Sequence, residues 1–498
     1  MKIYNSLTRQ KEEFVPLVEG QVGMYVCGPT VYGPTHLGHG RTYVNFDVVY
    51  RYLSYKGYNV KYIQNITDVG HLVGDGDEGE DKIQKQAKKE HIDPYAIAYK
   101  YECLYFDTMR ALNVLRPTIS CRATGFIMEM QDMIQTLIDK GYAYVTDAGN
   151  VYFDVKKDAE YGKLSNRTLD NNLSGTRIEL ADDKHSPEDF ALWKHADPEH
   201  LMKWRSPWGV GYPGWHIECS TMSKKFLGDT IDIHGGGMDN MFPHHESEIA
   251  QSECANGCQF VRYFMHNNLL TVNGTKMGKS LGNFITLEDI FKRFDPMVIR
   301  WFILSFHYRA MVDFNEKGLV LANEQYDKLN TAVAGLRATL KEDVYDDNSF
   351  INNVNLNSGL KNIYDEFIDA MDDDFNTTVA MSIVLKLTKE INKALADVND
   401  DKTRAISLMT NHDYLVQLNS LVHVLCEQIL GFKFKAQTSV NETPAIPEEI
   451  ERLADERMQA KKNKDWAKAD ALRAEITSKG YVVIDNKTEK GYTLEFKG

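Results

Sequence analysis

The 498-residue sequence lacks any apolar run long enough to cross a membrane, and its first ten residues contain no apolar segment typical of secretory signal peptides. Positive charge is also scarce, since 57 lysines and arginines stand against 71 aspartates and glutamates, a formal net charge of −14. This balance argues against a generic nucleic-acid-binding protein, although basic residues confined to one side of a large protein can still bind RNA. We therefore expect a cytoplasmic protein without membrane contact.

Cysteine is the next scarce residue. Seven cysteines are an odd number in a chain with no secretory segment, which indicates a reduced protein without a disulfide framework. Each cysteine taken alone is more often a small buried apolar residue than a ligand. With 43% hydrophobic residues, the chain has enough apolar surface for three or more domains.

The most informative segment present joins the apolar run 22–27 to a predicted helix. This turn carries His36 and His39, three residues apart in the first turn of the helix, with Gly38 between them. The positive end of a helix and its unpaired N–H groups attract phosphates, and the two imidazoles would lie on one face. The alternative is that both histidines are ordinary polar helix caps.

A second segment pairs with this turn. The loop around Met277 contains Lys276 and Lys279 and is followed by a helical pattern from Leu287. Lysine is a mobile point charge suited to nucleotide phosphates. A solvated surface loop is the alternative for the lysine loop considered alone.

Four further residues could hold a metal. Cys27 ends the first strand, Cys219 lies in a compact aromatic and polar segment, and His244 and Glu248 share one face of a predicted helix at i and i+4. Two thiolates, an imidazole and a carboxylate form a plausible zinc set. Cys254 and Cys258 are also close in sequence, but no second pair follows at zinc-finger spacing, and we expect them to be structural.

The segments His36-Leu-Gly-His39 and Lys276-Met-Gly-Lys279-Ser280 resemble the two signature motifs of class I aminoacyl-tRNA synthetases. Gly278 stands where that family usually has serine. Cys27 ahead of the first motif, Gly214-Trp-His-Ile-Glu-Cys219 and Phe242-Pro-His-His-Glu-Ser-Glu248 are similar to the cysteinyl-tRNA synthetase family. The resemblance implies a cysteine–tRNA ligase that forms cysteinyl-adenylate from ATP and transfers cysteine to the 3′ end of tRNA(Cys).

The resemblance also implies roles for individual residues. It implies one Zn²⁺ per subunit, which selects the substrate thiolate, and Mg²⁺ bound with ATP. The implied zinc ligands are Cys27, Cys219, His244 and Glu248; the implied catalytic residues are His36, His39, Lys276 and Lys279. We expect ATP contacts from Gly38, His234, Gly236, Asp239 and Lys279, since a strand running into a glycine turn suits close approach by adenosine. Thr67 and Trp215 are the expected contacts for L-cysteine.

Alternating strand and helix patterns, together with the resemblance, predict an α/β Rossmann-type catalytic domain with a parallel sheet, split by a connective insertion. A helical bundle and a small α+β domain follow. The predicted ranges are 1–110 and 208–270 for the catalytic domain, 111–207 for the insertion, 271–317 for the lysine-loop segment, 318–435 for a tRNA-binding bundle and 448–498 for an anticodon-binding domain. We expect a surface loop at 74–81, a linker at 436–447 and a monomer.

Two other functions stay open. A paralogous ligase that joins cysteine to an amino sugar would keep every zinc and ATP residue, but it should end near the helical bundle, so residues 448–498 argue against it. A zinc-stabilised adenylate-binding module without chemistry could dispense with the lysines that this chain retains.

Overall fold

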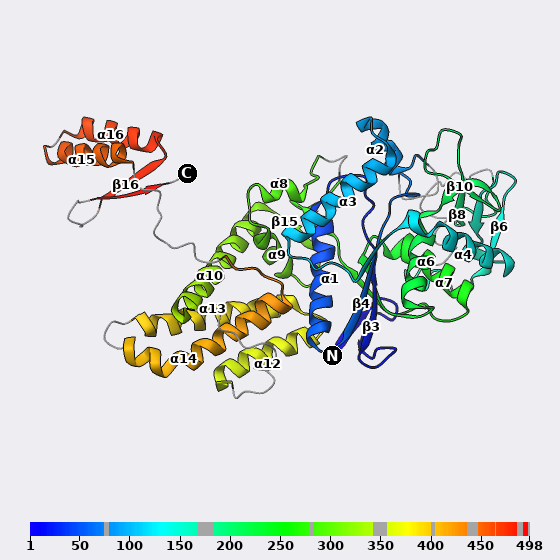
Figure 1. Ribbon diagram of the computed structural model, residues 1–498, viewed down its shortest axis with the longest axis horizontal. Helices are drawn as coiled ribbons and strands as arrows, with labels where there is room; N and C mark the ends of the chain where they lie inside the picture. Colours follow the sequence, from blue (N-terminus) through cyan, green and yellow to red (C-terminus); the bar gives the residue numbers. More distant parts are fainter. Residues whose placement is uncertain are drawn as a thin grey trace. The chain divides into compact units, whose positions relative to one another are not determined.

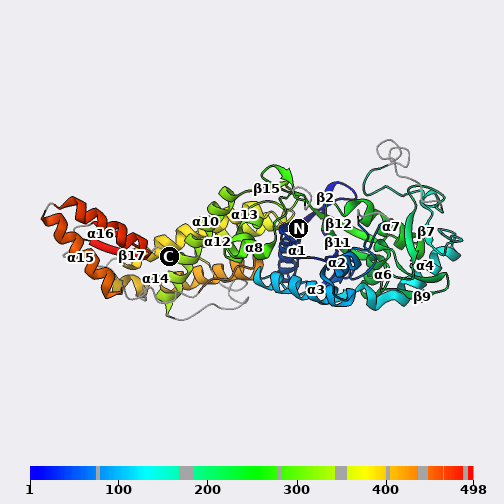
Figure 2. The ribbon, with the colours of Figure 1, turned by 90° about the horizontal axis from the view of Figure 1, so that it is seen from above.

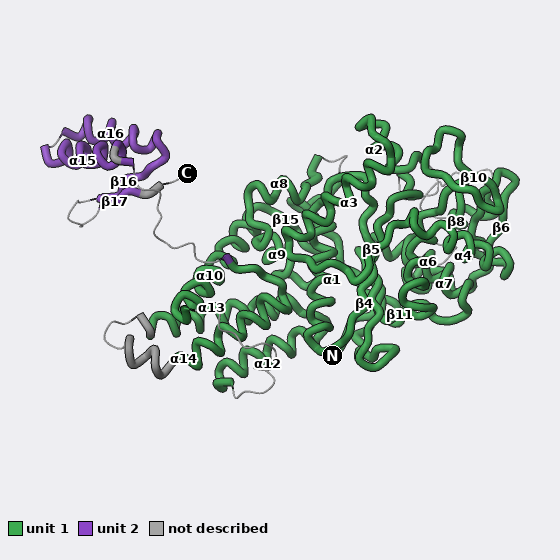
Figure 3. The backbone as a smooth tube through the Cα atoms, viewed as in Figure 1, with its two compact units in different colours: residues 1–434 green, residues 435–498 purple. Residues whose placement is uncertain are grey.

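The computed structural model describes residues 1–73, 79–167, 183–278, 282–341, 356–399, 404–435, 447–463, 465–485 and 492–496. They form two compact units, residues 1–434 and 435–498 (Figure 3), which we describe separately. Lys279, residues 74–78 of the predicted acidic loop and residues 436–446 of the predicted linker lie outside the described residues.

Five parallel strands form the central sheet of the first unit, in the order β12–β11–β3–β4–β5 (Figure 1). Their bounds are β3 Gln21–Val26, β4 Asn59–Ile66, β5 Ile119–Arg122, β11 Ile231–Gly237 and β12 Val261–Asn267. The chain runs outward in one direction from β3 to β5 and in the other through β11 to β12. Parallel sheets bind ligands where the strand order reverses, so the carboxyl ends of β3 and β11 mark the expected site.

Helices cover both faces of this sheet. Helix α1 (Leu37–Tyr55) lies on one face, and α4 (Ile127–Asp139), α6 (Trp215–Leu227) and α7 (Glu246–Asn256) lie on the other (Figure 1). The short π-helical turn η3 (Met241–His245) leads into α7. Further elements of the catalytic region are α2 (Lys82–Glu90), α3 (Pro94–Ala111), η1 (Ala123–Phe126), η2 (Val155–Lys157), β1 (Lys2–Asn5) and β2 (Gln10–Glu13).

The connective insertion is a second, antiparallel sheet of order β6–β7–β8–β10–β9. Its strands are β6 Ala143–Val145, β7 Val151–Phe153, β8 Phe190–His195, β9 Trp204–Ser206 and β10 Gly209–Pro213. The predicted bounds 111–207 are both too early, because β5 pairs with β4 in the central sheet and β10 belongs to the insertion. Strand β5 is only four residues long, with one buried side chain, so it has no apolar run to reveal it.

A helical bundle follows the lysine loop, as predicted (Figure 2). It contains α10 Glu316–Leu340, α12 Ser358–Asp372, α13 Thr377–Asn399, α14 Arg404–Leu421 and η5 Val422–Ile429. Between the central sheet and the bundle lie β13 Leu270–Val272, β14 Thr275–Lys276, α8 Leu287–Phe291, α9 Pro296–Leu304 and β15 Val312–Phe314. Across the described part of the chain, we find no helix with the length and apolarity needed to span a membrane.

A buried ion pair joins α1 to the end of the bundle. Arg300 on α9 is fully buried and contacts the carboxylate of Asp47 on α1. The same guanidinium donates to the carbonyl oxygens of Leu430 at 2.6 Å and Leu112 at 2.9 Å. A buried charge is tolerated when it is paired and its N–H groups are satisfied, which this arrangement provides.

The second unit is a small α+β module. Helices α15 (Glu448–Lys462) and α16 (Trp466–Ser478) pack on the antiparallel pair β16 (Tyr481–Asp485) and β17 (Tyr492–Phe496). Its separate apolar core includes Ile450, Leu453, Ile476 and Val483. Arg457, 4% exposed, extends from α15 to Asp485 with N–H donors at 2.8 and 3.1 Å.

Candidate active site and metal centre

A cleft of about 550 Å³ opens at the carboxyl ends of β3 and β11, where the strand order reverses. Nine residues predicted from the sequence to form the site line it: Cys27, His36, Gly38, His39, Thr67, Trp215, Asp239, His244 and Lys276. These residues come from segments up to 249 positions apart (27 to 276) and converge on one cleft. The topology of the sheet thus brings the proposed nucleotide and metal groups together.

The four predicted zinc ligands lie directly beneath the cleft, and their donor atoms are within 4.8 Å of one another. Cys27 Sγ lies 3.8 Å from Cys219 Sγ and 3.6 Å from Glu248 Oε1. His244 Nε2 lies 3.2 Å from the same carboxylate oxygen. Tetrahedral bonds of about 2.0–2.3 Å to zinc place neighbouring donors roughly 3.3–3.8 Å apart. The set therefore fits zinc in number, chemistry and spacing.

Burial sets the protonation of these donors. Burial raises the pKa of the Cys27 thiol well above its ordinary value, and the nearby Cys219 and Glu248 raise it further. Burial also raises the pKa of Cys219 to about 11 and lowers that of His244 well below its ordinary value. Thiolates in such surroundings need a compensating positive charge, which a divalent cation supplies.

A second group of four donors shares Cys27 and Glu248 and adds His234 and His245. In this group, His234 Nε2 lies 2.7 Å from Glu248 Oε2, a hydrogen-bond length that is shorter than the edge of a zinc tetrahedron. His245 Nε2 lies 3.3 Å from Cys27 Sγ. This geometry favours Cys219 and His244 as the other metal ligands, with His234 and His245 as their neighbours.

Two of the predicted ATP contacts are wrong. His234 is fully buried below the cleft and faces Glu248, and Gly236 is also buried. A Cβ at position 236 would lie 2.8 Å from the His245 ring, so this glycine permits the approach of a histidine rather than of adenosine. In the described end of β11 and the turn after it, Gly237 and Asp239 face the cleft.

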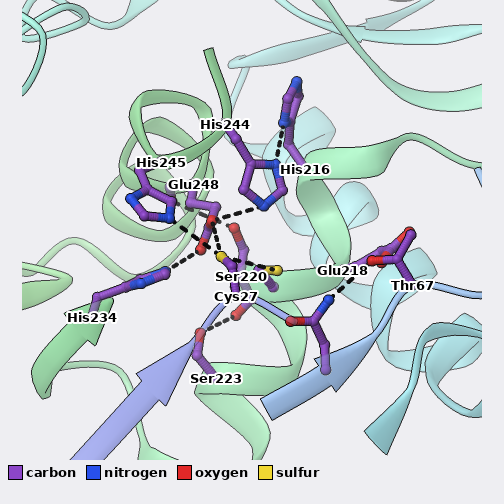
Figure 4. A network of polar contacts seen from close by, with 12 residues as sticks. Cys27, Thr67, His216, Glu218, Ser220, Ser223, His234, His244, His245 and Glu248 are labelled. Carbon is purple, nitrogen blue, oxygen red and sulfur yellow. Dashed lines mark hydrogen bonds and ion pairs between the residues drawn. The ribbon is translucent and has the colours of Figure 1, made fainter. Parts of the chain in front are cut away.

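Buried histidines orient the predicted ligands (Figure 4). His216 Nδ1 lies 2.8 Å from His244 Nδ1, and His245 Nδ1 lies 2.8 Å from His266 Nε2. His266 Nδ1 in turn lies 2.8 Å from the hydroxyl of Ser6. Such outer partners fix the tautomer and ring orientation of histidines at metal sites. Sequence reasoning missed them, although the adjacent pair of histidines in Phe242-Pro-His-His was a visible signal.

His36 and His39 prove to be reciprocal helix caps as well as residues of the cleft. The backbone N–H of His39 donates to His36 Nδ1 at 3.4 Å, and that of His36 donates to His39 Nδ1 at 3.3 Å. Their rings stack at 3.6 Å. Both interpretations of this turn therefore hold at once, because Nδ1 serves the cap while the stacked rings line the cleft.

Thr67 is held by a chain of buried hydrogen bonds (Figure 4). Its hydroxyl donates to Glu218 Oε2 at 2.8 Å and accepts from the Asn65 amide at 3.0 Å. Asn65 also accepts the N–H of Gly28 at 2.7 Å, beside the end of β3. A hydroxyl has one donor and two acceptor positions, so Thr67 can offer an acceptor to a ligand in the cleft.

Asn283 holds the described part of the lysine loop. Its side-chain oxygen accepts the N–H of Gly278 at 2.9 Å, and its amide donates to the carbonyl of Lys276 at 3.1 Å. Lys276, Met277 and Gly278 all line the cleft. The side chain of one asparagine thus closes the turn in which this chain carries glycine.

Comparison with known proteins identifies three segments. Residues 13–324 match the family described as tRNA synthetases class I (C) catalytic domain, residues 366–427 the DALR domain, and residues 443–492 the cysteinyl-tRNA ligase anticodon binding domain. These matches cover the central sheet with its insertion, most of the bundle and the second unit. They confirm the fold class predicted from the sequence.

Full-length relatives are similar over almost the whole chain. The cysteine–tRNA ligase of Bacteroides fragilis is 46% identical, with 98% of this chain and 97% of the relative covered, and that of Chlorobaculum tepidum is 45% identical, with 100% and 99% covered. Methionyl-tRNA synthetase of Mycobacterium tuberculosis, solved with methionyl-adenylate, shares the fold at a TM-score of 0.54 and 14% identity, covering 82% of this chain and 89% of that one. The chain therefore belongs to the cysteine–tRNA ligase family of class I aminoacyl-tRNA synthetases.

Proposed function

We propose that this ligase selects L-cysteine through a zinc ion held by Cys27, Cys219, His244 and Glu248, activates it with ATP and transfers it to tRNA(Cys). The observation that carries the proposal is the compact, buried donor set whose Cys27 and His244 reach the wall of the cleft. When bound there, zinc would supply an affinity for a thiolate that the hydroxyl of serine lacks. A site built for one chemical group rejects an analogue without it, so no separate editing domain is needed.

The residues around the metal position the rest of the amino acid. Trp215 stacks on His244 with 4.2 Å between ring centroids and forms a wall beside the donor set. Thr67 offers a hydrogen-bond acceptor, because its proton is donated to Glu218, and this matches the α-ammonium group rather than the carboxylate. This arrangement resolves which end of cysteine Thr67 contacts.

The nucleotide occupies the neighbouring part of the cleft. The N-terminus of α1, with His36, Gly38 and His39, binds the α-phosphate region, while Lys276 and Lys279 hold the departing diphosphate together with Mg²⁺. Asp239 contacts the adenosine side. The acid anhydride of ATP supplies the leaving group, so these residues act by orientation and by charge, with no nucleophilic side chain.

The second unit reads the tRNA. Its α16 begins with the exposed Trp466, and its helices carry the exposed bases Arg452 and Arg473, charges for phosphates beside an aromatic ring for stacking. Arg457 is excluded from this surface because it is buried against Asp485. We place the bundle at 318–435 on the tRNA as well, and the ligase acts in the cytoplasm as a monomer.

The amino-sugar ligase remains the competing function with the same cleft. The second unit argues against it, since residues 443–492 match an anticodon-binding family. An adenylate-binding module without chemistry is disfavoured because the chain retains both histidines and both lysines of the phosphate site.

Pyrophosphate exchange tests the proposal. Exchange should require L-cysteine, should be at least about a hundredfold slower with L-serine, and should fall sharply after removal of zinc by a chelator and recover when zinc is restored. Exchange that proceeds equally with serine, or that survives complete loss of zinc, would overturn the selection mechanism.

A further inference from the structure

We propose that Lys82, held in place by His71, binds the α-carboxylate of the amino acid. This inference rests on the proposed function, because it completes the same substrate site. Both residues line the cleft. They flank the segment whose residues 74–78 lie outside the description, and the proposal uses only the described residues at its base.

The contacts of His71 fix its tautomer. Lys82 Nζ lies 2.7 Å from His71 Nε2, and His71 Nδ1 lies 2.5 Å from the hydroxyl of Thr30. A lysine ammonium has only donors, so Nε2 must accept and Nδ1 must carry the proton that is donated to Thr30. Because an ammonium has three N–H donors, donation to His71 does not exhaust the capacity of Lys82.

Ring stacking places this ammonium at the amino-acid end of the cleft. His71 stacks on Trp215 with centroids 3.9 Å apart and planes at 10°, and Trp215 stacks on the predicted ligand His244. Thr30, the other partner of His71, forms a parallel bridge with Thr67. Lys82 is therefore attached on one side to the wall of the thiol site and on the other to the residue proposed for the ammonium.

The backbone holds the pair firmly. The N–H of Lys82 donates to the carbonyl of His71 at 2.9 Å, and that of Gly70 donates to Asp81 at 2.8 Å. Gly70 has a φ of +76°, and a Cβ there would lie 2.4 Å from the carbonyl oxygen of Pro213. Only glycine permits this close approach, which presses the segment against the end of the insertion sheet.

The charges of the cleft favour Lys82 for a substrate anion. Among the described residues that line the cleft, the other lysine or arginine side chains are Arg41 and Lys276. The guanidinium of Arg41 is buried and donates to the carbonyls of Leu269, Tyr308 and Ala310. Lys276 lies on the lysine loop, at the proposed phosphate site. Lys82 thus supplies a third attachment point, beside the thiol and ammonium contacts, and three points distinguish L- from D-cysteine.

A binding cycle tests this role. Cysteamine keeps the thiol and the amine of cysteine but lacks the carboxylate. In the zinc-loaded full chain, calorimetric titration should show that Lys82→Met weakens L-cysteine binding about tenfold or more and changes cysteamine binding less than about twofold. His71→Phe, which keeps an aromatic ring against Trp215, should give a smaller loss confined to cysteine. Lys85→Met, on the exposed side of the same helix, is the matched control.

Each outcome decides the matter. Equal weakening of both ligands in the Lys82 and His71 variants would show a structural role and overturn the inference, as would unchanged cysteine binding. A wild-type protein whose cysteine binding is indifferent to zinc would instead overturn the proposed function. Selective loss for cysteine, with partial recovery in Lys82→Arg, would support carboxylate binding.

Discussion

The imidazole of His234 lies 2.7 Å from the carboxylate of Glu248, and both side chains are fully buried. This contact explains how a flexible carboxylate can keep a fixed position beside two thiols. It also turns a residue expected to bind ATP into a support for the metal centre.

We predict that His234→Ala lowers zinc affinity about 10- to 100-fold, the usual effect of removing an outer partner of a metal ligand. Competition with a chromophoric chelator measures this directly. His216→Ala should have a similar effect through His244. Unchanged zinc affinity in both variants would contradict the assignment of these histidines.

Cys219→Ser should abolish stoichiometric zinc binding, because it removes one of two thiolates from the donor set. Metal analysis of the purified variant gives the answer. Cys121→Ser provides the control, since Cys121 is also buried, on the adjacent part of the sheet, but is outside the donor set. Zinc content that persists at one per chain in Cys219→Ser would argue for the second group of donors.

Asn283→Ala should slow adenylate formation about tenfold, because it removes two hydrogen bonds that close the lysine loop. Lys279→Ala should slow the same step further, and both variants should keep their zinc. Stopped-flow or pyrophosphate-exchange rates test this. Asn323→Ala, at an exposed position of α10, should match the wild type.

The second unit should lose stability in acid through one carboxylate. Hydrogen bonds from Arg457 and Lys461 hold the pKa of Asp485 well below its ordinary value. Because the folded pKa is the lower one, the contribution is complete above the unfolded value near 3.9 and is lost as pH falls below it. Asp485→Asn should therefore destabilise the unit at pH 7 and match the wild type near pH 2.

Hydrogen exchange of β16 and β17 in the full chain would measure this difference. We expect a loss of about 1 kcal/mol at pH 7, small because Asp485 is 44% exposed. Glu449→Gln breaks an exposed ion pair with Lys479 and should cost much less. An Asp485→Asn effect independent of pH would show that packing, not charge, connects the strand to α15.

The sequence predicted the elements that carry long periodic patterns. Helix α1, strand β4 and the bundle lie where apolar spacing placed them. Strand β5 escaped because four residues with one buried side chain leave no pattern. The nine cleft residues were found because motifs name them, whereas Lys82 and His71 depend on contacts that only the folded chain creates.

The exchange of roles around β11 has the same origin. A strand followed by glycines predicts close approach by some partner, but it does not say which. In the folded protein the partner at Gly236 is the ring of His245, a side chain nine residues further along. Backbone freedom is visible in sequence, while the group that uses it is decided by packing.

The contact of Arg300 with Asp47 also limits how the chain can be divided for study. Fragments that end before residue 430 would remove the carbonyl of Leu430 and leave a guanidinium inside the remaining body with fewer acceptors. Breaking a buried charged arrangement in this way typically costs about 3–5 kcal/mol. A minimal catalytic fragment should therefore keep the helical bundle and be cut after residue 434, where the two compact units divide.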